Sequence, residues 1–292
     1  MAIYSINDLE QLSGIKAHTL RVWEQRYGII VPQRTPTNIR FYTDNELRKL
    51  LNISLLNKHG YKISRIVNMT DSDIVNAVEE LARQHPEYDT HIDTLAISMV
   101  EMDEQKFEQI VGSRIFTNGF EATMIDTIFP FLDKINLLYL TGSIKPAQEH
   151  FVTILIRQKV IAAIDAIPLA SRQNATKFLI FLPEGERQEL TLLYLHYILK
   201  SRGFQVVNLG INLSTSDLEV GCELLSPHYI YTIFTEQHKQ SVAQRVESIC
   251  SICADIQVLL SGYLLENQIF TLPANARVLR DLETTLAFLK NL

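Results

Sequence analysis

The sequence predicts a multidomain protein with three parts: a mainly α winged helix-turn-helix head, an antiparallel helix bundle, and an α/β domain on a doubly wound parallel sheet. Two short helical patterns separated by Ser13-Gly14 predict the head. Apolar stripes at helical spacing fill residues 75–168 and predict the bundle. Short apolar runs alternate with helical patterns from residue 178 onward, which predicts parallel strands with crossover helices. We place the domain boundaries at 1–72, 73–169 and 176–292.

The head begins with two short helices joined by a tight turn. Apolar residues share one face of the first helix, and a Ser-Gly pair ends it. The second helix is expected over residues 16–26, with Leu20 and Trp23 on its core side. This geometry lays a second helix in the major groove of DNA, and the basic segment after it predicts a wing that closes with Phe41-Tyr42. The other residues that define this pattern are Ile6, Leu9, Leu12, Gly28, Pro32, Arg34, Pro36, Asn38 and Arg40.

The second helix and the wing carry the residues that we expect to contact DNA. Side chains on the outer face of such a helix reach base edges, whereas flanking basic and hydroxyl groups bind phosphates and set the register. The expected base contacts are Ala17, His18 and Arg21. The expected phosphate contacts are Arg26, Tyr27, Arg34, Arg40 and Tyr42. The alternative for this segment is a helical protein-interaction module with incidental arginines.

The charge distribution supports a nucleic-acid partner for the head alone. Residues 1–65 contain ten Lys/Arg and five Asp/Glu, a net charge of +5. Of the 27 basic and 33 acidic residues in the chain, 17 and 28 remain for residues 66–292, a net charge of −11. Phosphates attract a basic head and repel an acidic body.

Length and composition limit the class of protein. With 292 residues and 47% hydrophobic residues, the chain can bury more than one core. No apolar run approaches the ~20 residues that span a bilayer, and the N-terminus lacks the blocks of a signal peptide, so we expect a cytoplasmic protein without a membrane partner. Three cysteines, an odd number, argue against a disulfide framework. Cys250 and Cys253 form a C-x-x-C pair in a helical pattern, and Cys222 is distant, so we expect buried thiols and no metal site.

The rest of the chain is organised by helical stripes and then by strands. The bundle is expected to contain four helices before a fifth that begins at Pro146, with Pro130 kinking the fourth. Ligands of doubly wound sheets bind at the carboxyl ends of the strands, so loop 183–189 is the expected ligand region. The expected bundle helices are 74–84, 89–103, 104–117, 119–141 and 146–167, and the expected strands are 178–182, 205–209, 229–233, 256–260 and 277–279.

The head resembles the MerR family of winged-helix transcription regulators. The resemblance rests on Thr-Leu-Arg-Val-Trp-Glu-Gln-Arg-Tyr-Gly at residues 19–28, then on Pro32, Arg34-Thr35 and Arg40-Phe41-Tyr42. It covers about the first quarter of the chain and is specific in residue type and spacing. The resemblance implies a homodimer or higher homo-oligomer bound to a palindromic operator in double-stranded DNA that overlaps a promoter.

The three-part arrangement resembles the cobalamin-dependent photoreceptor regulators of bacteria. In that group a Trp, ten residues before a Glu-His pair, covers the upper face of the corrin; Tyr139 stands at the Trp position here. The lower face is held by the His of an acidic-x-His-x-x-Gly loop, in which Glu186 keeps the acid while Gln188 and Thr191 replace His and Gly. The pocket-equivalent residues are Tyr139, Glu149, His150, Glu186, Gln188, Thr191, Ser261 and Gly262.

These departures change the chemistry of the expected pocket. Imidazole is a good nitrogen donor to a transition metal that a carboxylate can tune, whereas the carboxamide of Gln188 is a poor donor. Thr191 adds bulk where a glycine permits close approach, and Tyr139 brings less ring area than Trp. We therefore expect that His-ligated cobalamin binding has been lost and that the chain holds no cofactor and no metal. Glu149 and His150 are then expected to make hydrogen bonds between subdomains.

The function that these observations favour is a sequence-specific DNA-binding transcription regulator of MerR type. No arrangement of nucleophile, base and orienting group is visible, so we do not expect an enzyme. The acidic body is expected to take another small-molecule effector or to serve as a platform for oligomers and partner proteins. The alternatives are a light-responsive regulator that binds cobalamin with unusual ligation and, in another class, a corrinoid-handling methyltransferase module. The basic head and Gln188 argue against the latter.

Overall fold

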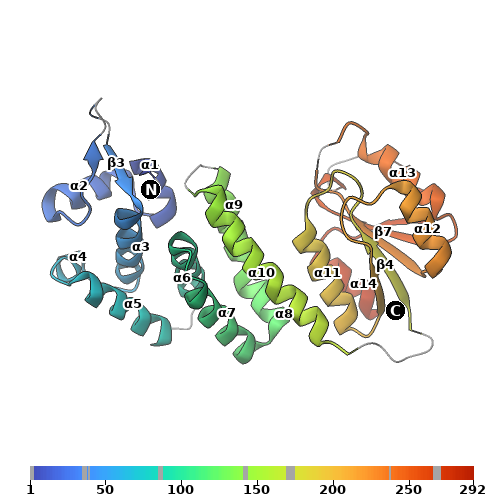
Figure 1. The fold of residues 1–292 in the computed structure, drawn as a ribbon, viewed down its shortest axis with the longest axis horizontal. Coiled ribbons are helices and arrows are strands. Elements are labelled where there is room, and N and C mark those ends of the chain that lie inside the picture. Colours follow the sequence, from blue (N-terminus) through green and yellow to red (C-terminus); the bar gives the residue numbers. More distant parts are fainter. Residues whose placement is uncertain are drawn as a thin grey trace. The chain divides into compact units, whose positions relative to one another are not determined.

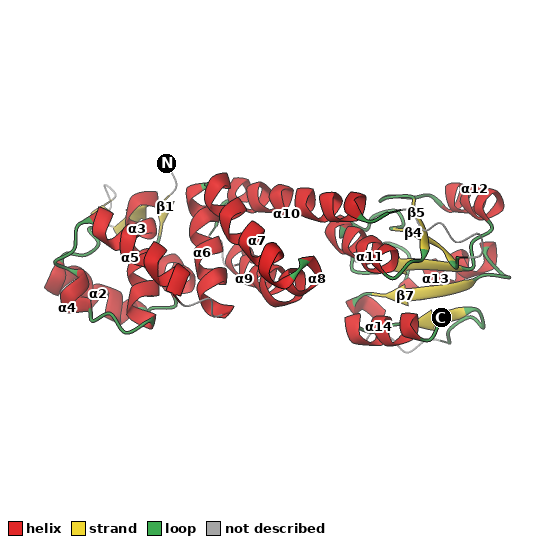
Figure 2. Cartoon of the chain, turned by 90° about the horizontal axis from the view of Figure 1, so that it is seen from below, coloured by secondary structure: helices red, strands yellow, loops and turns green. Residues whose placement is uncertain are grey.

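The computed structural model describes residues 3–34, 38, 40–84, 88–140, 144–168, 175–236, 238–265 and 271–292. The chain forms two compact units, Met1–Ile156 and Arg157–Leu292. The first unit contains a winged helix-turn-helix head and a helix bundle, and the second contains a five-stranded parallel sheet (Figures 1 and 2). The predicted fold class is thus confirmed.

The head combines a small antiparallel sheet, in the order β1-β3-β2, with four helices. Its helices pack through fully buried side chains that include Leu9, Leu20 and Leu47. A capping box fixes the start of the third helix, because the N–H of Thr43 donates to Oε2 of Glu46 at 2.9 Å. The elements are β1 (Ile3–Tyr4), α1 (Ile6–Ser13), α2 (Ala17–Tyr27), β2 (Gln33–Arg34), β3 (Arg40–Thr43), α3 (Asp44–Lys58) and α4 (Ile63–Ile66).

The bundle follows the predicted helices, with one irregularity before Pro130. The predicted fourth helix is divided into α8, a π-helical turn η1, and α9. The N–H of Phe129 donates to the carbonyl of Met124, five residues back. Proline has no N–H and therefore interrupts the series of helical backbone hydrogen bonds. The wider π turn just before Pro130 lets the helix continue past this interruption. The elements are α5 (Asp71–Gln84), α6 (Tyr88–Glu101), α7 (Glu104–Asn118), α8 (Phe120–Thr123), η1 (Met124–Ile128), α9 (Phe129–Leu140) and α10 (Pro146–Ala166).

The sheet of the second unit is parallel throughout and has the order β5-β4-β6-β7-β8. From β4 the chain adds β5 on one side and then returns to add β6 on the other. The strand order therefore reverses between β4 and β6, and this switch point is where doubly wound sheets bind ligands. The strands are β4 (Lys177–Phe181), β5 (Gln205–Asn208), β6 (Tyr229–Ile233), β7 (Gln257–Ser261) and β8 (Ala276–Val278).

Helices cover both faces of this sheet (Figure 1). On one face α12 and α13 pack on a core that contains Leu179, Ile230 and Val258. On the other face, Tyr229 of β6 contacts Phe288 of α14 edge to face at 5.7 Å between ring centroids. The remaining elements are α11 (Glu189–Ser201), α12 (Thr215–Leu225), α13 (Val242–Ile252), the 3-10 turn η2 (Tyr263–Leu265) and α14 (Leu282–Lys290).

Two expectations about the whole chain stay predictions. The boundaries 1–72, 73–169 and 176–292 describe sequence patterns, whereas the compact units meet between Ile156 and Arg157, inside α10. A cytoplasmic location also remains a prediction. Within the described ranges, no helix has the length and apolar character needed to cross a membrane.

Candidate functional site

The N-terminus of α2 is held by a side chain from α1. Helix α1 ends at Gly14, which adopts a φ of +71° and donates its N–H to the carbonyl of Glu10 at 2.8 Å. The Glu10 carboxylate accepts the N–H of Ala17 at 2.9 Å and pairs with Nζ of Lys16 at 3.0 Å. The bond from Ala17 and the nearby Lys16 ammonium hold the pKa of Glu10 below its usual value. Because the first turn of a helix has free N–H groups, this carboxylate caps α2 and fixes its angle to α1.

Helix α2 presents the predicted base-reading residues on its outer face. His18 and Arg21 are exposed and Ala17 is half-buried. Leu20 is fully buried and Trp23 is 8% exposed, which confirms them as core residues. The helix is therefore anchored by its apolar side and leaves a polar side free.

The wing places two arginines opposite each other. Strands β2 and β3 pair so that Arg34 faces Arg40, and both side chains are exposed. Nη1 of Arg34 donates to Oδ1 of Asn38 at 2.7 Å, while residues 35–37 and 39 lie outside the described part, including Pro36. Like charges directly opposite in an antiparallel ladder repel each other; Glu24 pairs with Arg40, and an anion beside Arg34 would reduce the repulsion further. The pair is thus suited to a phosphate.

Glu24 joins α2 to the wing. Its Oε1 lies 3.3 Å from Nε of Arg40, and its Oε2 accepts a hydrogen bond from the Tyr42 hydroxyl at 3.2 Å. Tyr42 is fully buried, and burial together with the Glu24 carboxylate raises its pKa to about 12. We expected Tyr42 among the phosphate contacts, but its side chain is buried. Its hydroxyl instead donates to Glu24, which also pairs with Arg40 of the wing. The role of Glu24 was not foreseen, because it depends on residues 16 and 18 positions away.

Arg26 and Tyr27 lie in the last turn of α2. The Arg26 guanidinium stands 5.3 Å from the centroid of the Tyr27 ring, a cation–π distance. Arg26 is exposed and Tyr27 is half-buried. Gly28 then ends the helix with a φ of +62°, so the chain turns toward the wing directly after these two residues.

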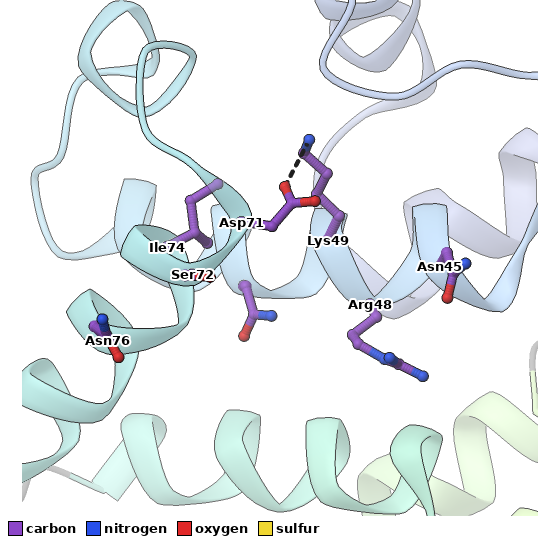
Figure 3. Close-up of a pocket in the computed structure, with 8 residues that line it drawn as sticks. Asn45, Arg48, Lys49, Asp71, Ser72, Ile74 and Asn76 are labelled. Atoms are coloured by element: carbon purple, nitrogen blue, oxygen red, sulfur yellow. Dashed lines mark ion pairs between the residues drawn. The ribbon is translucent and has the colours of Figure 1, made fainter.

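A polar hollow of about 600 Å³ lies beside α3 in the first unit (Figure 3). Across it, Nζ of Lys49 on α3 pairs with Oδ1 of Asp71 on α5 at 2.9 Å. Asn52 is 4% exposed and contributes a carboxamide to the wall. Amide and charged groups of this kind can hydrogen-bond a polar molecule, and the sequence patterns did not point to them. The described lining residues are Asn45, Arg48, Lys49, Asn52, Asp71, Ser72, Ile74 and Asn76.

In the second unit, Glu186 occupies the switch point of the sheet. Its Oε2 accepts the N–H of Thr235 at 2.8 Å and the N–H of Glu236 at 3.0 Å, both in the loop after β6. Its Oε1 pairs with Nη1 of Arg245 on α13 at 2.9 Å, and both side chains are almost fully buried. The loop after β4 is thereby fastened to the loop after β6. The Glu186 carboxylate points toward α13 and the amides of that loop. These contacts explain why the chain has an acidic residue at position 186 although position 188 is not a histidine.

Gln188 and Thr191 lie at the start of α11. Gln188 is exposed, stands at the N-cap and accepts no N–H of the first turn through its side chain. Thr191 is also exposed. The imidazole of His238 lies beside the same loop, because a Cβ added to Gly185 would stand 3.1 Å from a carbon of that ring. A carboxamide in this position is open to a ligand but is a weak donor to a metal.

Ser261 is the last residue of β7 and Gly262 follows it, next to the loop after β6. Gly262 adopts a φ of +111°, and an added Cβ would lie 2.1 Å from the carbonyl oxygen of Phe234. The N–H of Phe234 donates to the carbonyl of Ser261 at 2.8 Å. Gly262 is thus required by the close approach of two protein backbones.

The residues predicted for the upper face of a corrin belong to α9 and α10. Tyr139 is in α9, and its side chain lies outside the described part. In the first turn of α10, Nε2 of His150 lies 3.5 Å from Oε2 of Glu149, and the His150 side chain is 76% exposed. Glu149 also accepts a hydrogen bond from the Thr153 hydroxyl at 3.0 Å. Glu149 is thus held within its own helix, while the imidazole of His150 is free to meet another group.

Comparisons with known proteins agree with the winged helix-turn-helix structure of the head. Residues 4–73 match the family described as MerR HTH family regulatory protein. Over a similar length, 76 residues are 30% identical to the HTH-type transcriptional regulator MlrA of Escherichia coli (strain K12), covering 26% of this chain and 31% of that protein.

Two relatives match over most of the chain. The HTH-type transcriptional repressor CarH of Myxococcus xanthus is 27% identical over 234 residues, which cover 78% of this chain and 77% of the relative. The HTH-type transcriptional repressor CarA of the same organism is 24% identical over 260 residues, covering 88% and 85%. The similarity therefore extends beyond the head.

Three solved structures are similar at low identity. The monomethylamine corrinoid protein of Methanosarcina barkeri has a TM-score of 0.37 and 14% identity, covering 83% of this chain and 96% of that one. The methanol:cobalamin methyltransferase complex MtaBC of the same organism has a TM-score of 0.35 and 14% identity, covering 81% and 92%. A cobalamin-binding protein of Desulfitobacterium hafniense DCB-2 has a TM-score of 0.32 and 16% identity, covering 60% and 84%.

The prediction that the chain holds no cofactor is contradicted by these comparisons. The match to CarH and CarA extends beyond the head into the C-terminal region, and these relatives point toward cobalamin. The expectation rested on the substitutions at Tyr139, Gln188 and Thr191, and replacing a cap residue, a loop glycine and a metal ligand does not by itself remove the rest of a binding region. The chain is a DNA-binding transcription regulator with an N-terminal MerR-type helix-turn-helix domain and a cobalamin-binding-like region after it.

Proposed function

We propose that this regulator reads a palindromic operator with α2 in the major groove, as a homodimer or higher homo-oligomer, and acts as a repressor. The observation that carries the proposal is the construction of the head, in which Glu24 ties the wing to α2 while His18 and Arg21 stay exposed. A reading helix must be fixed on one side and free on the other. Repression is proposed because the two relatives that match most of the chain, CarH and CarA, are transcriptional repressors.

Arg21→Ala tests the placement of α2. Duplexes that bind the wild-type chain are enriched from a randomised library, and one is labelled and titrated with each variant. We expect a loss of about 1–3 kcal/mol in binding free energy with an unchanged circular dichroism spectrum, because one base contact disappears. The matched control is Arg280→Ala, an exposed arginine of the second unit, which should bind like wild type. Equal affinity of Arg21→Ala and wild type would refute the assignment of the reading helix.

We further propose that the second unit binds a cobalamin whose lower side is not ligated by residue 188. Gln188 and Thr191 are exposed at the carboxyl edge of the sheet, beside the switch point where doubly wound domains take ligands. This donor set fits a cobalamin that keeps its own base or water at the metal, since a carboxamide competes poorly as a ligand. When bound, the group would supply a metal centre that can exchange a ligand. The residues of the chain would hold it and sense its state.

The test is an absorbance spectrum of the full chain after mixing with adenosyl-, methyl- or hydroxocobalamin in the dark and desalting. We expect corrin bands that remain with the protein in stoichiometric amount. A colourless protein would overturn this second proposal and leave the DNA-binding proposal standing, because that one is tested by the titration. Protein that retains the group would then be compared for operator affinity in the dark and after illumination.

The rival function, a corrinoid-handling methyltransferase module, predicts the same spectrum but no operator. Methyl transfer does not require a basic head or a helix α2 that is held against the wing by Glu24. The library enrichment therefore separates the two functions: a methyltransferase module would enrich no sequence above the random pool.

A further inference from the structure

Cys222 and Cys253 lie against each other although 31 positions separate them in the chain. Their Sγ atoms are 3.1 Å apart. Cys222 belongs to α12 and Cys253 directly follows α13, the two helices that cover one face of the sheet. The C-x-x-C spacing drew attention to Cys250 and Cys253, but the fold brings Cys222 to Cys253. All three thiols are free.

The backbone around Cys253 is fixed by one side chain. Nδ2 of Asn275 donates to the carbonyls of Cys253 at 2.9 Å, Cys250 at 3.1 Å and Ile256 at 3.2 Å. On the other side, the carbonyl of Cys222 accepts the N–H of Ser226, which ends α12. The two sulfurs therefore meet between anchored elements, and a bond between them requires little rearrangement of the backbone.

The two thiols differ in access and acidity. Cys222 is half-buried, whereas Cys253 is 2% exposed and Cys250 is 3% exposed. The hydrogen bond between the two sulfurs lowers the pKa of Cys222 and raises the pKa of Cys253, which burial raises further. Burial also raises the pKa of Cys250 to about 11. A thiolate is the reactive form, so a small oxidant meets Cys222 first, and Cys250 stays inert.

We propose that Cys222 and Cys253 are a modification site at which hydrogen peroxide produces an intramolecular disulfide. Cys222 sulfur attacks one peroxide oxygen, the O–O bond breaks, and a sulfenic acid and one water form. Cys253 sulfur then attacks Cys222 sulfur, the S–O bond breaks, and its thiol proton leaves with the hydroxyl group as a second water. The sulfurs lose two electrons, which reduce the peroxide. A disulfide bond is about 2.05 Å long, so the sulfurs need to approach by about 1 Å more.

The experiment treats the full chain with hydrogen peroxide and counts thiols under denaturing conditions, with peptide mapping by mass spectrometry. We expect two of the three thiols to disappear, the peptides of Cys222 and Cys253 to be joined, and dithiothreitol to restore both thiols. Cys250→Ala is the matched control and should form the same bond. In Cys222→Ser no intramolecular bond should form. The oxidised wild type should also unfold at a higher temperature than the reduced form, because the bond ties α12 to the end of α13.

Two results would overturn the proposal. The first is that three free thiols remain after exposed methionines have already been oxidised. The second is a bond between Cys250 and Cys253 or between two chains in place of the expected one. If Cys222→Ser fails to fold, Cys222→Ala replaces it, and the mapping of wild type and Cys250→Ala alone decides the outcome.

Discussion

Tyr42 shows that the surroundings of a residue decide its role more than its type does. Its sequence position next to Arg40 indicates a phosphate contact, yet its side chain is buried and its hydroxyl donates to Glu24. Arg34 and Arg40, on the same small sheet, remain exposed. At this scale the head divides into residues that can touch DNA and residues that hold them in place.

Tyr42→Phe separates these two roles. We expect a loss of about 1–2 kcal/mol in the free energy of unfolding, since one hydrogen bond to a carboxylate is removed, and no change in the salt dependence of DNA binding. A phosphate contact would instead lower the salt slope by about 1. The pKa of Tyr42 is raised to about 12, so wild type should lose stability as the pH rises from about 10 through 12. Urea unfolding across this range measures the loss, and the Phe variant should lack that component.

The periodicity of apolar residues predicted most of the helices and strands. The apolar run at 178–182 became β4 (Lys177–Phe181), because a short apolar run bounded by Pro183 and Gly185 fits a buried parallel strand. The fourth bundle helix was predicted as one piece over 119–141, but it contains the π turn η1. A helical stripe cannot show such a turn, since one extra residue shifts the pattern by less than a third of a turn.

The loop after β4 depends on one buried ion pair. We expect Arg245→Met to lower the free energy of unfolding by about 3–5 kcal/mol, because it leaves the Glu186 carboxylate buried without its cation. Urea denaturation of the full chain measures the change. In the double variant Glu186→Gln, Arg245→Met the buried charge is gone, and part of the stability should return. Equal stability of the single and double variants would contradict the cost that we assign to the unpaired Glu186 carboxylate.

The candidate site was less predictable than the fold. The exposed positions of His18, Arg21 and Arg34 agree with the sequence-based expectation, because helix and strand periodicity determine which face a residue occupies. The support from Glu10 and Glu24 was missed. Each pairs with groups outside its own helical pattern, and local spacing contains no information on such contacts.

Within the first unit, the head is fastened to the bundle. Asp93 of α6 pairs with Nζ of Lys58 on α3 at 2.7 Å, and its other oxygen accepts from Nζ of Lys134 on α9 at 2.5 Å. Burial opposes the charge of Asp93, but the two ammonium groups hold its pKa below the usual value. One carboxylate thus joins a helix of the head to two helices of the bundle.

Asp93→Asn should weaken this joint. We expect about 2–3 kcal/mol less stability at neutral pH, because two charge-assisted hydrogen bonds are lost at a largely buried position. Since the pKa of Asp93 is lowered by folding, its contribution is present above about pH 4 and is lost as the pH falls further. Asp133→Asn, an exposed carboxylate on α9, is the control and should unfold like wild type. Identical urea midpoints for Asp93→Asn and wild type would contradict the joint.

The buried Glu186 has a consequence for protein design. Backbone N–H groups at the switch point of a doubly wound sheet are the natural cradle of a ligand phosphate, and here a side chain of the chain itself already satisfies them. An engineer who wished to graft a nucleotide site onto this scaffold would have to remove that carboxylate and its arginine together. Changing Glu186 or Arg245 alone leaves the other charge buried without a partner. No single substitution therefore converts the present site into a phosphate-binding site.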